Sequence, residues 1–145
     1  MMNSLTFAME EQSSGFQDKV EVHVVIGNES CDLDSAVCSV VLAYFLTLTS
    51  GTKDVVFIPV LDIPQQKYHL RTETTFLLRK HGISDELLTF NDQIDLDDLH
   101  RQLKLKLSLV DHNILPQKYI RLDDCVVSVT DHRPQVRKQD NRLVS

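Results

Sequence analysis

The chain has 145 residues, 42% hydrophobic and 25% charged, and its 15 Lys and Arg against 21 Asp and Glu give a formal net charge of -6. This balance, with only 4 Gly and 4 Pro, excludes collagen-like, low-complexity and intrinsically disordered classes and favours one globular domain. An acidic chain without a basic stripe also lacks the electrostatic footprint that duplex nucleic acid requires.

A β-branched run opens the ordered part of the chain. Residues 22–26 are β-branched and apolar except for His23, and they end at Gly27, which is typical of a buried strand. Residues 35–49 then carry apolar positions at helical spacing, and Asp34 or Ser35 can cap this helix. We expect the helix to be buried. Strand, loop and helix therefore form the first unit.

The same alternation continues to the end of the domain. An acidic stretch before one of the later helices suits the positive end of the helix dipole. For Asp92 two roles are open, a place near the edge of the site or a cap of that helix, and we favour the cap. The expected elements are strand 55–60, helix 72–81, strand 87–90, helix 95–103, and strands 105–110 and 126–130.

Alternating strands and helices predict the fold class. They favour parallel pairing through right-handed crossovers, which gives an α/β, Rossmann-like open sheet, mainly parallel and five-stranded, with helices on both faces. We expect the loop after the first strand to lie at the centre of the sheet. Residues 21–135 make up this domain, residues 1–20 an N-terminal adapter, and residues 136–145, which have no periodicity, a disordered tail.

Location follows from what the sequence lacks. Residues 1–15 have neither the basic start nor the apolar run of a secretory signal. The longest apolar stretch, residues 36–48, is shorter than the ~20 residues of a membrane span. The three cysteines form no C-x-x-C pair, which argues against disulfides and a zinc knuckle. These features predict a cytoplasmic protein without membrane contact.

Polar side chains follow three of the expected strands, at the edge where ligands bind in open α/β sheets. Convergence of several carboxylates is costly unless a cation neutralises them, and carboxylates with an imidazole suit Mn²⁺ or Mg²⁺. Each motif taken alone has an ordinary structural explanation, because Asp-x-Asp before a helix is commonly an N-cap and Asp-His is a common pair in loops. Their combination after three strands favours a metal site. The three segments are Asn28 to Ser35, Asp111-His112-Asn113 and Asp131-His132-Arg133.

These segments resemble, in order and spacing, the first three motifs of the DHH phosphoesterase superfamily. The resemblance covers residues 23–134 and is closest to the prune-type exopolyphosphatases, and beyond them to yeast exopolyphosphatase and the family II inorganic pyrophosphatases. The motifs read Gly27-Asn28-x-x-x-Asp32-x-Asp34-Ser35, Val110-Asp111-His112-Asn113 and Asp131-His132-Arg133-Pro134.

The resemblance implies a two-metal centre of Mn²⁺ or Mg²⁺. Asp32 and Asp34 would each bind one ion, Asp111 would bridge both, and His132 would be a further ligand. Such a centre can activate a water that attacks a phosphoanhydride. The implied substrate is short-chain polyphosphate or another small phosphorylated molecule. We place the catalytic role on Asp111, His132 and Arg133, and substrate binding on Asn28, His112 and Arg133.

Three departures from the family pattern bear on activity. Asn28 stands where the pyrophosphatases carry a metal-binding His, as in the prune branch. Arg133 replaces a second His thought to protonate the leaving group, although an Arg can hold phosphate. The sequence stops before the fourth motif and the C-terminal DHHA2-type domain, so we expect an incomplete DHH domain with weak or no activity.

Two classes of function therefore compete. The first is a metal-dependent phosphohydrolase, with cyclic-nucleotide phosphodiesterase activity as a further option that the resemblance implies. The second is a catalytically impaired metal-binding module with regulatory protein partners. A plain nucleotide-binding domain is disfavoured because no glycine-rich loop follows the first strand.

Other polar residues have structural explanations. We expect His23 to be a packed or edge histidine, and Cys31 and Cys38 to have packing roles. The loop after the second strand contains Lys67, His69 and Arg71, which could meet phosphate but are expected to be solvated. His81 and His100 should lie near helix ends.

Overall fold

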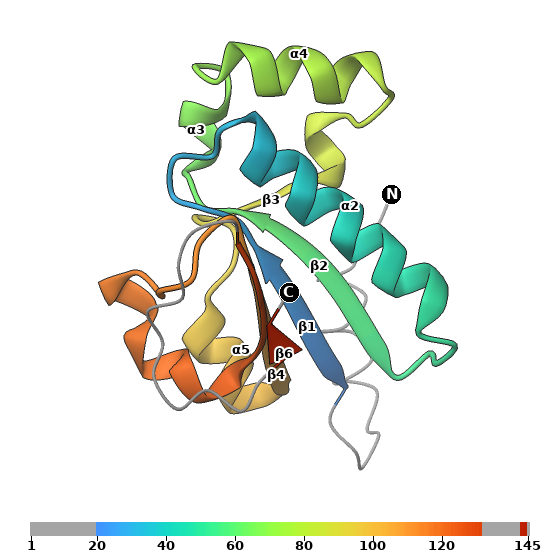
Figure 1. The fold of residues 1–145 in the computed structure, drawn as a ribbon, viewed down its shortest axis with the longest axis vertical. Coiled ribbons are helices and arrows are strands. Elements are labelled where there is room, and N and C mark those ends of the chain that lie inside the picture. Colours follow the sequence, from blue (N-terminus) through green and yellow to red (C-terminus); the bar gives the residue numbers. More distant parts are fainter. Residues whose placement is uncertain (1–19, 132–142, 145) are drawn as a thin grey trace.

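The computed structural model describes residues 20–131 and 143–144, and these build one parallel sheet (Figure 1). The strand order is β3-β2-β1-β4-β5-β6, which puts β1 and the loop that follows it at the centre, as the sequence predicts. The α/β class with a parallel sheet is confirmed. The strands are β1 (Glu21–Ile26), β2 (Val55–Leu61), β3 (Thr89–Phe90), β4 (Lys104–Val110), β5 (Val126–Thr130) and β6 (Leu143–Val144).

The sixth strand is an addition to the five that the sequence predicts. β6 is two residues long and pairs in parallel with β5. It lies within 136–145, the predicted tail, and the other residues of that range are outside the described residues. A two-residue strand carries no recognisable periodicity, so the sequence pattern could not predict it.

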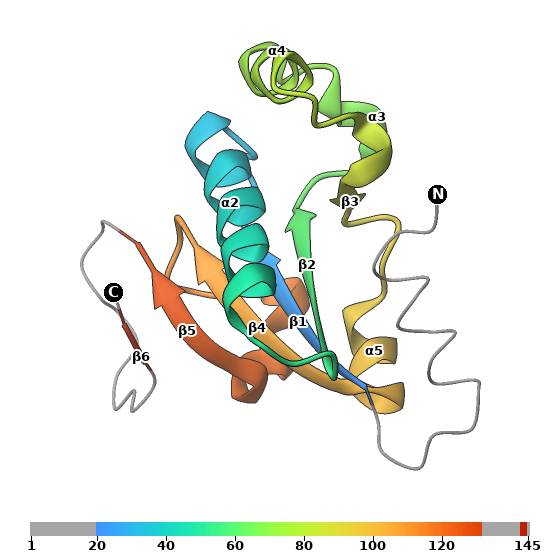
Figure 2. The same ribbon diagram turned by 90° about the vertical axis from the view of Figure 1, so that its right-hand side faces the viewer.

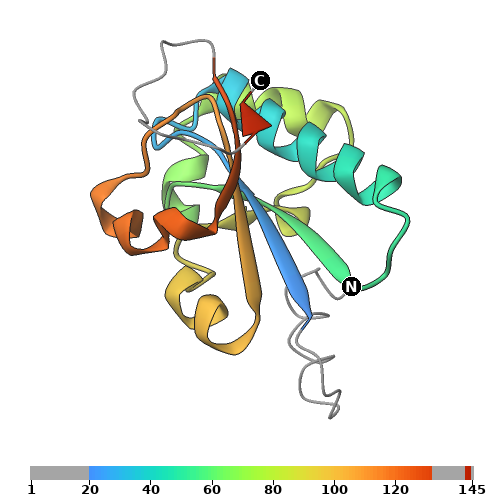
Figure 3. The ribbon, with the colours of Figure 1, turned by 60° about the horizontal axis from the view of Figure 1, so that its bottom comes forward.

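Helices cover both faces of the sheet (Figures 2 and 3). α2 lies on one face, and α5 and η2 lie on the other, while α3 and α4 form a small layer beside α2. Among the described residues, no helix combines the length and the apolar character needed to cross a membrane. The helices are α2 (Leu33–Thr49), α3 (Gln65–Tyr68), α4 (Thr72–Lys80), α5 (Leu96–Gln102) and the 3-10 helices η1 (Asp85–Leu87) and η2 (Gln117–Cys125).

Alternation along the strands divides the core between the two faces. Val24 of β1 and Leu107 of β4 are fully buried against α5 and η2. On the other face, Val25 and Val110 pack against Ala43 of α2. A third cluster joins α2 to α3 and α4 and includes the buried residues Cys31, Ala36, Tyr68, Leu78 and Phe90. Apolar side chains on both faces of β1 and β4 are what a central parallel strand requires.

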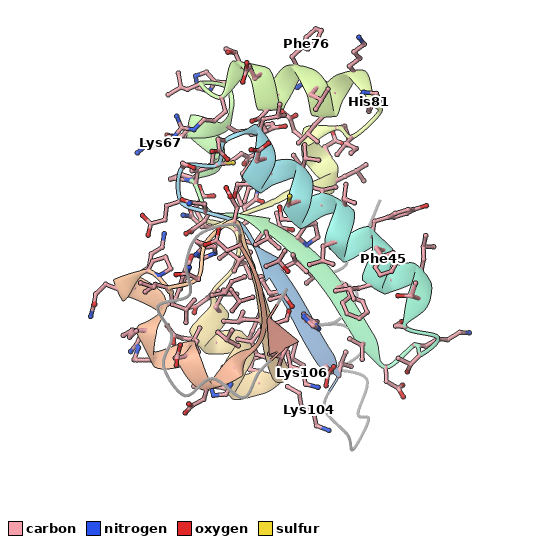
Figure 4. All side chains as sticks on the ribbon, viewed as in Figure 1. Phe45, Lys67, Phe76, His81, Lys104 and Lys106 are labelled. Atoms are coloured by element: carbon pink, nitrogen blue, oxygen red, sulfur yellow. The ribbon has the colours of Figure 1, made fainter. Side chains whose placement is uncertain are left out.

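Helix α2 corrects the expectation of a buried helix. Its small residues Ser35, Ala36, Ser39 and Ala43 face the protein interior. Four of its large apolar residues lie on the outer side; Phe45 is labelled there in Figure 4. Others, namely Val37, Val40, Leu42 and Leu46, are partly buried against the core. The exposed fractions are 57% for Val41, 66% for Tyr44, 56% for Phe45 and 65% for Leu48.

Two helix caps also differ from the predictions. The carboxylate of Asp32, rather than Asp34 or Ser35, caps α2 by accepting from the backbone N–H of Ser35 at 3.0 Å. Asp95 caps α5, and the predicted capping role of Asp92 is wrong. Asp92 instead accepts from the backbone N–H of Gln65, because the chain returns to that loop after β3.

His23 is a packed histidine within the central strand. Its Nε2 lies 2.6 Å from Ser108 Oγ, which lies 2.6 Å from Ser128 Oγ, so a polar chain crosses β1, β4 and β5. The ring centroid is 5.2 Å from that of Phe57. Burial lowers the pKa of His23, an effect that Glu21 opposes and Lys106 adds to.

This lowered pKa predicts acid-sensitive stability. Below about pH 6.5, the unfolded His23 takes up a proton that the folded one resists, so stability should fall as the pH falls. Urea unfolding at pH 7.5 and 5.5 measures this, with His23→Gln as the comparison because it keeps a hydrogen-bonding group and loses the titration. The variant should lose less stability on acidification, and an equal loss in both proteins would contradict the assignment.

Candidate functional site

The loop between β1 and α2 is built around a close approach of its two ends. A Cβ on Gly27 would collide with Ser35 Oγ and lie 3.1 Å from the Ser35 backbone oxygen, so this position requires glycine. The backbone N–H of Asn28 donates to Ser35 Oγ. These contacts hold Asp32 and Asp34 at the start of α2, directly above the end of the central strand.

Asn28 ties this loop to the neighbouring strand. Its Nδ2 donates to the backbone oxygen of Asp111 at 3.1 Å, and its Oδ1 accepts from the backbone N–H of Ser30 at 3.0 Å. Both polar atoms of the amide therefore have protein partners. The predicted contact of Asn28 with substrate stays a prediction.

Asp111 leaves β4 in the left-handed region, with φ of 61°. Its backbone N–H donates to the oxygen of Thr130 at 2.8 Å, which links the ends of β4 and β5. A non-glycine residue in this region is strained by roughly 1–3 kcal/mol, and such strain commonly occurs at functional sites. The bend places Asp111 beside the β1–α2 loop.

Three carboxylates act electrostatically on the thiol of Cys38, which is exposed rather than packed as the sequence predicts. Burial raises the pKa of Cys38, and the charges of Asp111, Asp34 and Asp32 raise it further. These carboxylates come from two different strand ends, so their approach depends on the tertiary fold. The structure thus places the three acidic residues that the family resemblance implies as metal ligands at one edge of the sheet, after the paired strands β1 and β4.

His112 and Asn113, which follow β4, form hydrogen-bond contacts with the ends of other segments. His112 is 8% exposed, its Nε2 lies 3.2 Å from the oxygen of Ile26, and its Nδ1 lies 3.3 Å from the oxygen of Ile114. Asn113 Nδ2 donates to Asp131 Oδ2 at 3.0 Å. These contacts give His112 a structural role in joining β1 to β4, and its predicted role in substrate binding stays a prediction.

Not all of the predicted metal ligands lie within the described residues. His132 and Arg133 lie outside the described residues. Within residues 20–131, no group of three or more His, Cys, Asp or Glu side chains is arranged to hold a metal ion. The predicted ligands among the described residues are all carboxylates, and carboxylates suit Mn²⁺ or Mg²⁺. They do not form a preformed metal site by themselves, and the fourth predicted ligand, His132, lies outside the described residues. The metal therefore remains a proposal.

A second group of polar residues was missed from the sequence. Asp62, the first residue after β2, is 3% exposed, and its Oδ1 accepts from Lys118 Nζ at 2.8 Å, Tyr119 OH at 3.0 Å and Asn91 Nδ2 at 3.1 Å. The rule that residues after parallel strands face the ligand edge, applied also to β2 and β3, would have found Asp62 and Asn91. No pattern marks Lys118 and Tyr119.

The segment after β2 forms the short helix α3 rather than a loop, but Lys67 and His69 are exposed to solvent, as the sequence predicts. Lys67 lies in α3 (Figure 4), and Arg71 precedes α4. Burial raises the pKa of Cys31 to about 11, and among nearby charges Arg71 opposes this rise, so the Arg71 guanidinium lies near the loop after β1. His69 borders a groove of about 640 Å³ along α4, which no residue of the predicted site lines; its lining is His69, Thr72, Thr75, Phe76, Arg79 and Lys80.

Comparisons with known proteins agree with this architecture, which is consistent with a DHH phosphoesterase domain. No family model matches the chain. The chain is 44% identical over 130 residues to the Mus musculus protein named exopolyphosphatase PRUNE1, which covers 90% of this chain and 28% of that protein. It is 42% identical over 121 residues to Homo sapiens exopolyphosphatase PRUNE1, covering 83% of this chain and 26% of that protein.

A third relative is the Mus musculus protein named protein prune homolog 2, 38% identical over 109 residues, or 75% of this chain and 4% of that protein. Over the matched residues, the chain belongs to the prune-type DHH phosphoesterases. It spans little more than a quarter of the length of the PRUNE1 relatives.

Proposed function

We propose that this chain carries the metal-binding part of a hydrolase site that cleaves phosphoanhydride bonds of short-chain polyphosphates. The observation that carries the proposal is the position of Asp32, Asp34 and Asp111 after the paired strands β1 and β4, whose ends Asn28 joins by donating to the Asp111 backbone oxygen. The names of the PRUNE1 relatives support the substrate class. Carboxylates gathered at one edge of a sheet repel one another, and a divalent cation would remove that cost.

The residues would divide the work as follows. Two Mn²⁺ or Mg²⁺ ions, held by Asp32, Asp34, Asp111 and His132, would supply a water of lowered pKa and neutralise phosphate charge. Asn28 fixes the backbone of Asp111, so it would keep the bridging carboxylate aligned with the loop after β1. Arg133 would hold a phosphate oxygen, because a guanidinium binds phosphate through two N–H donors.

The cellular location and the protein partners are also part of the proposal. A cytoplasmic location and regulatory protein partners, both expected from the sequence, stay predictions. The competing function is a metal-binding module without catalysis. Phosphate release from tripolyphosphate at saturating Mn²⁺ separates the two, because the module would bind the ion and release no phosphate.

Mn²⁺ should raise the melting temperature of the chain. Binding to the native state alone contributes about 2.7 kcal/mol at 100 times Kd, which corresponds to roughly 5–10 °C for a protein of this size. Asp111→Ala should abolish the rise, measured by thermal unfolding monitored by circular dichroism. Asp54→Ala is the matched control, since Asp54 precedes β2 at the opposite end of the sheet and is exposed.

The proposal fails if Mn²⁺ gives the parent chain no rise at all. If Asp111→Ala gains as much as the parent, the assignment of Asp111 as the bridging ligand is wrong, although another metal site would remain.

A further inference from the structure

The buried carboxylate of Asp62 gathers polar groups from three separate segments. Its side chain has no exposed surface, and its Oδ1 accepts hydrogen bonds from Lys118 Nζ, Tyr119 OH and Asn91 Nδ2. Its Oδ2 is buried and has no hydrogen-bond partner among the described residues. Lys118 and Tyr119 begin η2, which follows the Asp111 loop, and Asn91 follows β3. This group lies at the same edge of the sheet as the predicted metal ligands.

Strand pairing places the group beside the loop after β1, because the backbone N–H of Gly27 donates to the oxygen of Val60 at 3.4 Å and Asp62 follows two residues later. Burial raises the pKa of the Tyr119 hydroxyl, as do the charge of Asp62, its hydrogen bond and the charge of Glu29. Asp62 also contributes to the raised pKa of Cys31, together with Asp32. Glu29, Cys31 and Asp32 all belong to the loop that carries the first predicted metal ligands. The Asp62 group therefore forms one border of the proposed site.

Lys118 is held in place without being covered. An ammonium group has three N–H donors. Among the described residues, Lys118 gives one hydrogen bond, to Asp62, and its Nζ lies 5.0 Å from the centroid of the Tyr119 ring. Its side chain is 45% exposed. The remaining donors are thus open to an anion, and the ordering cost of a long flexible side chain has already been met.

We propose that Lys118 is a phosphate-binding residue of this site and that Asp62 is the residue that positions it. The inference rests on the proposed function and deepens it, since it assigns a cation for the phosphate chain to this domain itself. The ligand class is a linear phosphoanhydride anion. A lysine acts on such a ligand as a point charge, so it would favour total phosphate charge over one fixed geometry.

Calorimetric titration with tripolyphosphate, at saturating Mn²⁺, tests the role of Lys118. Lys118→Ala should weaken tripolyphosphate binding by about tenfold, which is typical of losing a hydrogen bond between charged groups. Binding of Mn²⁺ measured alone should be unchanged. Lys104→Ala is the matched control, because it removes the same charge at the far end of the sheet (Figure 4) and should stay within about twofold of the parent.

Asp62→Asn tests the positioning role through the sign of its effect. Removal of a negative charge near a polyanion should by itself strengthen binding. If Asp62 positions Lys118, the variant should instead weaken tripolyphosphate binding, by about threefold or more, because the ammonium loses its charged anchor. Circular dichroism and thermal unfolding report whether the variant is folded, and Lys118→Ala keeps the inference testable if it is not.

The outcomes separate the two proposals. A parent chain that binds neither Mn²⁺ nor tripolyphosphate overturns the proposed function and this inference with it. A parent chain that binds both, with Lys118→Ala within twofold of it, overturns the inference alone. Tighter binding by a folded Asp62→Asn shows that Asp62 repels the ligand and removes its positioning role.

Discussion

Gly27→Val should lower the free energy of unfolding by about 3 kcal/mol, at the upper end of what overpacking a well-packed site costs. The added Cβ would fall on Ser35 Oγ and close to the backbone oxygen of Ser35. The hydroxyl can rotate away, but the backbone oxygen belongs to the first turn of α2. The variant must therefore displace the helix start, which also carries the Asp32 cap.

Urea unfolding followed by circular dichroism measures this effect. Gly51→Ala is the control, since its Cβ would meet nothing within 4 Å and only its φ of 66° penalises the change. That control should lose about 1 kcal/mol. If Gly27→Val loses no more than the control, the contact with Ser35 is looser than described. Because Asn28 and Asp32 move with the loop, the stabilisation by Mn²⁺ should shrink in the same variant.

Leu107→Ala should cost about 2–5 kcal/mol and lower the melting temperature by roughly 10 °C. Leu107 is fully buried in the centre of β4 and lies in register between Val24 of β1 and Val126 of β5. Truncation leaves a cavity that neighbouring strands cannot close, since their backbones are fixed by pairing on both sides.

The control for Leu107 lies on α2. Val41 is also apolar but 57% exposed, so Val41→Ala should change the free energy of unfolding by no more than about 0.5 kcal/mol. Thermal and urea unfolding compare the two variants. A cost for Val41→Ala equal to that for Leu107→Ala would mean that the outer side of α2 is covered in solution.

The parallel sheet was predictable because it depends on patterns that are local in sequence. The β-branched run before Gly27 and its counterpart at residues 55–60 mark buried strands, and the helix between them leads to parallel pairing. Handedness of the crossovers then leaves few arrangements. The same reasoning located Asp32, Asp34 and Asp111 at one edge of the sheet, where the structure has them.

What could not be predicted depends on tertiary contacts. The spacing of Val41, Phe45 and Leu48 indicates a helix, but not that its small residues would face the sheet. Asp92 has the composition of a cap, yet the chain uses it to hold Gln65 from another loop. The partners of Asp62 in η2 are more than fifty residues away in sequence, so no local pattern could predict them.

The position of β1 has a consequence for synthesis on the ribosome. His23 and Ser108 lie side by side in the sheet but 85 residues apart in the chain. At roughly 5–20 residues per second, about 4–17 seconds pass before the second neighbour of β1 is made. During that interval β1 has at least one open edge, which is a template for pairing with other chains. The central strand that organises the finished domain is therefore the segment that most needs protection while the domain is being made.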